Sequence, residues 1–102
     1  MASRLELHEE LCDILENRNV YYQPPASIKM NYPCIRYSLS GIDSLRADDR
    51  QYKNTRRYEI ILIDTNPDSI FFDRILNRFS MCSFDRAYTA DNLNHFVFTI
   101  YY

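Results

Sequence analysis

Three residues in the last quarter of the chain have side chains that could form a nucleophilic site. Cys82 could supply a thiolate, His95 its base, and Asp91 a carboxylate that orients the histidine. Asp91, however, stands four residues before His95 in a segment typical of a turn, and no glycine or helix start nearby would provide an oxyanion hole. We therefore interpret His95 as a sheet-face residue and Asp91 as a turn residue. We expect no catalytic residue and no enzymatic activity.

Metal binding would need carboxylates, imidazoles or thiolates at a suitable spacing. Asp64, Asp68 and Asp73 flank the expected start of a helix, but capping and the helix dipole account for the first two. His8 lies at the edge of the apolar face of another expected helix, which indicates a boundary residue. The cysteines are odd in number and far apart, which favours reduced, buried thiols without zinc-like spacing, namely Cys12, Cys34 and Cys82. We expect neither a metal nor a cofactor.

One basic cluster stands out, formed by Arg50, Lys53, Arg56 and Arg57 with tyrosines between them. It could contact nucleic acid, or it could be a solvated hairpin arm balanced by nearby aspartates. A third interpretation pairs it with an acidic stripe on the first helix, because head-to-tail subunits of a ring need complementary surfaces. The residues expected at a subunit or partner interface are Glu6, Glu9, Glu10, Asp13, Arg46, Asp48, Asp49, Arg50, Tyr52, Lys53, Arg56 and Arg57.

The composition predicts one folded domain over residues 1–102. Hydrophobic residues make up 46% of the chain and charged residues 25%, which argues against disorder. The net charge of −2 lacks the basic surplus of a duplex-binding domain. A single glycine, Gly41, excludes a glycine-rich phosphate loop, and nine tyrosines favour a protein-binding surface. Acids stand where a secretory signal would need an apolar stretch, and no apolar run could cross a bilayer, so we expect the chain to begin in a cytoplasm without membrane contact.

The apolar periodicity predicts two helices. The first runs from the N-terminus to about Asn17, with an apolar face formed by Leu7, Leu11, Cys12, Ile14 and Leu15. The second opens at Asn66-Pro67-Asp68, with Asn66 as N-cap and Pro67 at the first helical position. Ile70 falls on the polar side of this helix, which indicates a contact outside the core.

Four strands are expected between and after the helices. Residues 33–39 alternate and predict a half-buried strand, residues 55–64 predict a central strand, and residues 40–54 between them predict a long polar loop. Residues 82–89 and 94–102 predict two strands joined by a turn. Residues 20–22 are a short extended piece. The predicted fold class is α+β, an αββ-αββ chain with two helices packed on one face of a four-stranded, largely antiparallel sheet.

Three segments resemble a known family: Met30–Tyr37, Arg57–Asp64 and above all Phe84–Phe98. They resemble small tail-terminator, tail-completion and head–tail joining proteins of siphophages and prophages, with the resemblance covering residues 5 to 102. It implies a subunit similar to the lambda-type tail terminator, which closes into a sixfold ring. Such a ring caps the tube of major tail protein and presents a surface to the head–tail connector. The resemblance also implies that loop 40–54 projects from the ring, and it carries no catalytic residues.

We therefore expect a virion structural protein of the tail or neck, assembled in a bacterial cytoplasm. Its expected partners are further copies of itself, the major tail tube protein and the head–tail connector proteins, with nucleic acid met at most as DNA passing through the lumen. A head-completion or neck adaptor that binds the portal or connector is the alternative within this class. A small nuclease or thiol hydrolase and a nucleic-acid-binding regulator are the alternatives from other classes.

Overall fold

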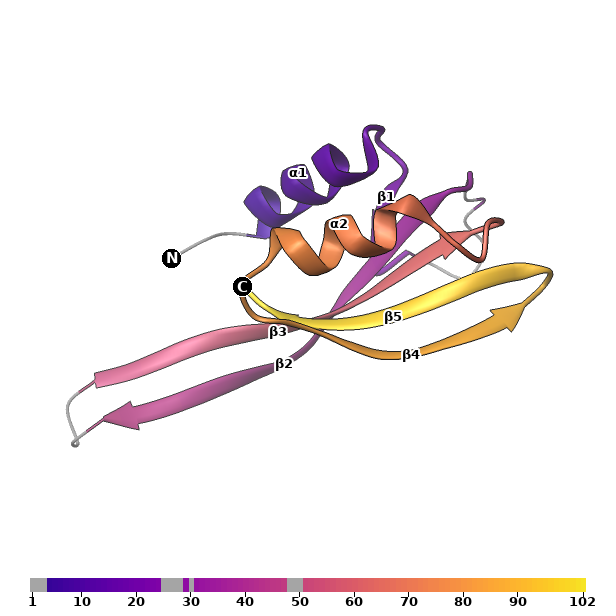
Figure 1. Cartoon of the computed structure of the whole chain (residues 1–102). Helices are drawn as coiled ribbons and strands as arrows, with labels where there is room; N and C mark the ends of the chain where they lie inside the picture. The colour runs from indigo at the N-terminus through magenta and orange to yellow at the C-terminus, as the bar shows by residue number, and fades with distance from the viewer. Residues whose placement is uncertain (1–3, 25–28, 30, 48–50) are drawn as a thin grey trace.

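Two helices form one layer over a five-stranded sheet, and a long hairpin extends beyond both layers (Figure 1). The computed structural model of the chain describes residues 4–24, 29, 31–47 and 51–102, and for residues 43–47 and 51–55 it describes the backbone alone. The elements in chain order are α1 (Arg4–Leu15), β1 (Val20–Tyr22), β2 (Cys34–Ala47), β3 (Gln51–Asp64), α2 (Ile70–Arg78), β4 (Cys82–Ala90) and β5 (Leu93–Tyr101).

The sheet has the order β1-β2-β3-β5-β4, in which β1 pairs with β2 in parallel and every other pair is antiparallel. β3 therefore lies at the centre, as its apolar run Ile60–Ile63 predicts. The α+β class with two helices is confirmed, whereas the prediction of four strands is wrong. The fifth strand is β1, whose residues Val20–Tyr22 align with Ile35 to Tyr37. Three residues are too few for a periodic pattern, so only pairing with a distant segment identifies this strand.

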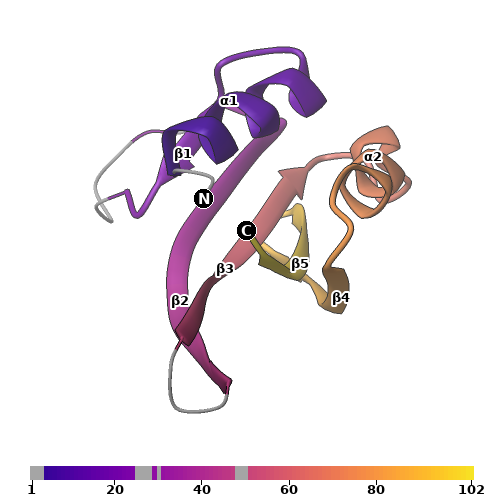
Figure 2. The ribbon, with the colours of Figure 1, turned by 90° about the vertical axis from the view of Figure 1, so that its left-hand side faces the viewer.

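Both helices pack against the same face of the sheet, and the core lies between the two layers. Figure 2 shows α1 beside β1 and β2, and α2 beside β5 and β4. The five residues predicted for the apolar face of the first helix are all buried. From the sheet they meet residues that are at most 2% exposed, namely Ile35, Tyr37, Tyr58, Ile60, Leu62, Phe98 and Ile100. Burial of this apolar surface is the main stabilising term of the fold.

The second helix begins later than predicted, because Asn66 closes a turn instead of capping the helix. The N-cap is Ser69, whose hydroxyl accepts a hydrogen bond from an amide of the first helical turn. The Asn66 side chain accepts from the amide of Asp68 at 2.9 Å, which fixes a turn before the helix. Asn-Pro pairs favour turns as well as helix starts, so the sequence allowed both outcomes. Ile70, the first helical residue, is 62% exposed, as its position on the polar side predicts.

Most of the segment predicted as a long loop belongs to two paired strands. β2 runs to Ala47 and β3 begins at Gln51, with a register that continues from Ile42 opposite Arg56 to Ala47 opposite Gln51. The loop prediction is wrong because it rested on the loss of apolar alternation. This part of the hairpin extends past the other strands and helices, where no core requires alternation (Figure 1). We call residues 41–47 and 51–57 the arm.

The arm makes the molecule long. The principal extents of the molecule are 50 × 26 × 23 Å. Its radius of gyration is 14.6 Å, compared with about 13 Å for a compact domain of this size. At the other end of the sheet, the predicted β4–β5 hairpin is confirmed. Its turn residues Asp91 and Asn92 have φ values of 54° and 63°, which are typical of the tight turns that join antiparallel strands.

Candidate functional site

The base of the arm is fixed by a bulge in β2 and by Arg57 of β3. The register shifts between Leu39 and Gly41, which leaves Ser40 unpaired. Arg57 Nε donates to the Ser40 hydroxyl at 3.3 Å, and this hydroxyl donates to the Arg57 carbonyl at 3.0 Å. A Cβ at Gly41 would lie 2.5 Å from Arg57 Nη2, so glycine at this position lets the guanidinium approach the β2 backbone. The arm therefore leaves the sheet in a defined direction.

Beyond its base, the arm is a two-stranded ribbon. β5 pairs with β3 only as far as Arg57, and one further bond joins the Tyr102 amide to the Arg56 carbonyl at 3.0 Å. β1 pairs with β2 only as far as Tyr37. A two-stranded hairpin is marginally stable in water by itself, and its open edges can pair with another chain. Ile42, where the ribbon leaves the sheet, is 56% exposed. Within the described chain, the arm is therefore the element that a contact with another chain would stabilise most.

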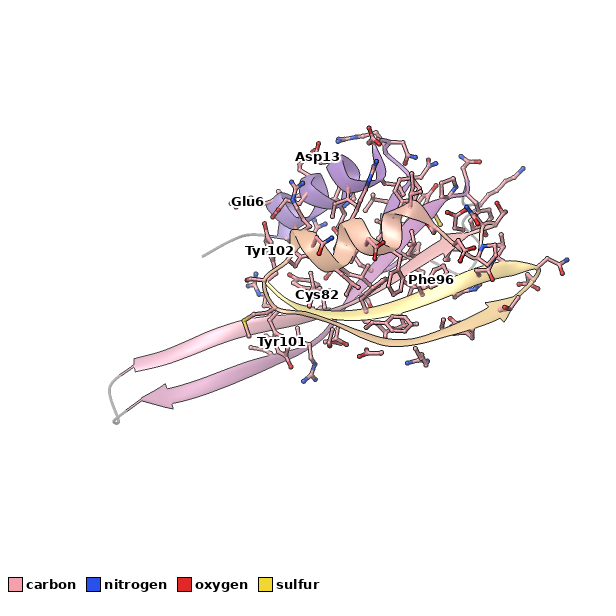
Figure 3. The ribbon with its side chains drawn as sticks, in the orientation of Figure 1. Glu6, Asp13, Cys82, Phe96, Tyr101 and Tyr102 are labelled. Carbon is pink, nitrogen blue, oxygen red and sulfur yellow. The ribbon has the colours of Figure 1, made fainter. Side chains whose placement is uncertain are left out.

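The residues predicted at an interface fall into two sets. Glu6, Glu9, Glu10 and Asp13 lie on α1, and Arg46, Tyr52, Lys53, Arg56 and Arg57 lie on the arm. Asp48, Asp49 and Arg50 lie outside the described residues. Figure 3 shows Glu6 and Asp13 on the helix layer, away from the strands that form the arm. That the two sets meet between different copies of the chain stays a prediction.

Most of the acidic residues on α1 already have arginine partners within the chain. The pairs and their N–O distances are Glu9–Arg18 at 2.8 Å, Glu10–Arg78 at 3.1 Å, Asp13–Arg78 at 3.1 Å and Glu16–Arg74 at 2.6 Å. Arg74 and Arg78 stand one turn apart on α2, so the three pairs that they form join α2 to α1 and to Glu16 just after it, whereas Arg18 follows α1 in the chain. The arginine spacing on the polar face of the second helix was the sequence signal for this contact. Each exposed pair contributes little stability, but a cation from a neighbour would have to compete with these arginines.

Glu10 has a second partner in Tyr102. The Tyr102 hydroxyl donates to this carboxylate, and its ring packs edge-on against Phe79 with centroids 6.0 Å apart. Burial, followed by the contact with Glu10, raises the pKa of Tyr102 to about 12. The hydroxyl therefore remains a donor at neutral pH. Glu10 thus has two partners, Arg78 and Tyr102.

The residues considered for nucleophilic chemistry do not come together. Cys82 lies at the start of β4, opposite Ile100, and packs against the core on the helix-covered face. His95 lies opposite Tyr88 near the other end of β4 and stacks on its ring, with centroids 4.7 Å apart. Burial raises the pKa of the Cys82 thiol, which opposes thiolate formation. In the described part of the chain, no three histidine, cysteine, aspartate or glutamate side chains gather closely enough to hold a metal ion.

His8 has a structural contact that predicts a pH dependence of stability. Its Nδ1 lies 2.8 Å from the Tyr37 hydroxyl, to which Arg4 also donates. Burial, reinforced by Arg4, lowers the pKa of His8 below its ordinary value of 6.5. The unfolded chain therefore takes up the proton first as the pH falls. We expect this part of the stability to be complete above pH 6.5 and to be lost as the pH falls from there towards the folded-state pKa.

Urea unfolding between pH 7.5 and pH 5 measures this dependence. In the variant His8→Gln, the free energy of unfolding should change less over this range than in the unaltered chain. Asp and Glu residues titrate mainly at lower pH and contribute equally to both proteins. Equal slopes in the two proteins would contradict the assignment to His8.

A hollow of about 340 Å³ lies between α2 and the sheet, at the end away from the arm. It is lined by Pro67, Asp68, Ser69, Phe72, Asp73 and Phe96. Phe96 is labelled in Figure 3 on the half of the sheet distant from the arm, whereas Cys82 and Tyr101 lie near the base of the arm. The cross-strand partner of Phe96 on β4 is Ala87, a residue with a small side chain.

Comparison with known proteins adds no relative to these observations. No protein-family model and no curated protein sequence matches the chain. None of the helices described is long and apolar enough to cross a membrane.

Proposed function

We propose that the chain is a structural subunit of a long-tailed phage or prophage virion, which assembles into a ring that caps the tail tube and joins it to the head. The observation that carries this proposal is the arm. It is a paired ribbon with a fixed base, open edges and an exposed Ile42, attached to a body with its own core. An element of this kind is suited to a contact between proteins.

The charge of the chain is divided between the arm and the remainder. The arm strands contain Arg46, Lys53, Arg56 and Arg57 against Asp43, which gives 4 − 1 = +3. Residues 48–50 contribute −1, so the rest of the chain carries −2 − 3 + 1 = −4. A basic arm and an acidic body attract each other between copies and repel between like parts. This arrangement favours a head-to-tail contact, which forms a ring when its rotation closes.

The mechanism is geometric. A ring caps a tube when one of its faces fits the growing end and the other lacks the surface that recruits the next tube subunit. The same second face is then available to the connector of the head. The exposed tyrosines and the mixed charges of the body are residue types that such protein interfaces use.

Loss of the chain from the virion tests the proposal. Particles assembled without it should have tail tubes of uncontrolled length and few joined heads, and expression of the chain in trans should restore both. Electron microscopy of the particles gives tube lengths and the fraction of joined heads. Normal joined particles would refute the proposal.

A pull-down with purified major tail tube protein and with connector protein separates the tube cap from a neck adaptor. Binding to the tube protein is the expected result. Retention on the connector protein alone would identify the chain as a neck adaptor.

A further inference from the structure

The hollow beside α2 has the features of a docking groove. Phe72 of α2 and Phe96 of β5 line it, with ring centroids 5.6 Å apart, and Ala87 of β4 stands next to Phe96 in the sheet. Phe84, further along β4, packs against Phe72 and is nevertheless 42% exposed. Ile70, 62% exposed, stands one turn before Asp73 on α2. The hollow is thus lined by two aromatic rings together with polar side chains, and it adjoins further exposed apolar side chains.

The rim of this hollow is acidic, and its charges are not neutralised. Asp68 and Asp73 line the hollow and are exposed, and neither has an ion-pair partner among the residues that the structure describes. The acids of α1 differ in this respect, because most of them pair with an arginine of their own chain. A cation from another copy would therefore meet less competition at Asp68 and Asp73 than at Glu9 or Glu10.

β4 offers an open backbone edge beside the hollow. It is the last strand of the sheet, and eight of its positions pair with β5 on one side, while no described strand pairs with the other side. Such an edge carries unpaired N–H and C=O groups that can accept a further strand. The arm has the matching property, since both of its edges are open beyond its base.

The arm also matches the hollow in charge and chemistry. Its strands carry a net charge of +3, and the register places Ile42, Arg46, Tyr52 and Arg56 at positions on one face of the ribbon. Ser44 and Asn54 lie between them on the same face, so this face combines apolar, aromatic, basic and polar residues, which suits a hollow lined by aromatic rings with acidic residues at its rim.

The arm extends from one end of the molecule, and Phe96, which lines the hollow, lies on the half of the sheet distant from the arm (Figures 1 and 3). The arm therefore cannot reach the hollow of its own chain, and each copy has one arm and one hollow. Contacts between them run in one direction from copy to copy, as a heterologous interface does.

We infer that the arm of one copy docks in the hollow between α2 and β5 of the next copy, adds a strand pair to the open edge of β4 and places its basic residues at Asp68 and Asp73. This inference rests on the proposed function, because it identifies the contact that closes the ring. It assigns the acidic half of the interface to α2 instead of α1.

Charge reversal on each side tests the contact. The groove variant Asp68→Lys/Asp73→Lys and the arm variant Arg46→Glu/Arg56→Glu should each raise the dissociation constant of self-association at least about tenfold, because like charges would then face each other. Sedimentation velocity over a range of concentrations measures this constant. The chain that carries all four substitutions should associate again, since opposite charges are restored.

Mixing the two variants tests whether the contact joins different copies. An equimolar mixture should associate again, because the arm of each variant then meets a groove of opposite charge on the other variant. Glu9→Lys is the matched control on α1, and it should change the dissociation constant by less than about twofold. Thermal melting establishes that each variant is folded. The neutral variant Asp68→Asn/Asp73→Asn keeps side-chain size and should weaken association to an intermediate degree. It replaces the lysine variant in this test if the lysine variant does not fold.

The outcomes distinguish this inference from the proposed function. If the unaltered chain forms rings, alone or on tail tubes, and the groove variants form them equally well, the inference is wrong and the proposed function stands. If Glu9→Lys disrupts the rings and the groove variants do not, the acceptor is α1. If the unaltered chain neither associates with itself nor caps tubes, both the inference and the proposed function are wrong.

Discussion

Removal of the arm is expected to give a folded chain that no longer assembles. Replacing residues 43–55 with Asn-Gly joins Ile42 to Arg56, which are opposite each other in the register, by a two-residue turn that suits antiparallel strands. No residue of the deleted segment belongs to the described core, and the bond from the Tyr102 amide to the Arg56 carbonyl is retained. The free energy of unfolding should therefore stay within about 1 kcal/mol of that of the unaltered chain. Ring formation should be lost.

Two measurements check this result together. Urea unfolding gives the stability of the shortened chain, and light scattering, with electron microscopy of tail tubes, gives its assembly. Asn92→Gly is a matched control because it alters the turn of the other hairpin, where φ at this position is already 63°. This control should assemble normally. Rings formed by the shortened chain would show that the arm is not part of the subunit contact.

The largest loss of stability is expected from Phe98→Ala. Phe98 is fully buried on β5, and its ring contacts those of Phe72 on α2 and Phe84 on β4, with centroids 5.2 and 5.6 Å apart. Truncation removes buried apolar surface and leaves a cavity, which destabilises a domain by about 3–5 kcal/mol. Total stability is commonly about 5–15 kcal/mol, so a large share would be lost. Tm should fall by more than about 12 °C.

Phe84→Ala is the matched control for this substitution. Phe84 is the cross-strand partner of Phe98 and the same residue type, but it is 42% exposed. Its truncation should destabilise the domain by roughly 1 kcal/mol, because solvent already reaches much of the ring. Similar losses from both variants would mean that the core does not depend on the contact between α2 and the centre of β5. Phe84 also lies next to the hollow, so its variant should weaken assembly more than stability.

The sequence was sufficient to predict the helices and the central strand, which face the core. Each helix buries one stripe and β3 is apolar on both faces, so the spacing of leucine, isoleucine and phenylalanine residues identified both helices and the central strand. The sequence also predicts the turn at Asp91-Asn92, since these two residue types tolerate positive φ.

The candidate site was predicted less completely. The basic residues around Arg56 were identified as one half of an interface, and this remains a prediction. The arginine partners of the α1 acids were not foreseen, because the contact between Arg78 and Glu10 joins residues 68 positions apart. The hollow was missed as well, since it forms where Phe96 of β5 meets α2 and the segment before this helix.

The sequence by itself determined the class of the fold, the buried face of each helix and the central place of β3, because periodicity in a chain reflects burial of one face. Only the tertiary structure decided that residues 41–47 and 51–57 form an arm, that β1 adds a fifth strand and that Glu9, Glu10 and Asp13 of α1 pair with arginines of the same chain. These features arise from pairing that buries little surface, within one hairpin for the arm and between distant segments for β1 and for the ion pairs of α1 with α2. Backbone hydrogen bonds and ion pairs of this kind leave no periodic pattern in the sequence, so their partners become visible only when the chain is folded.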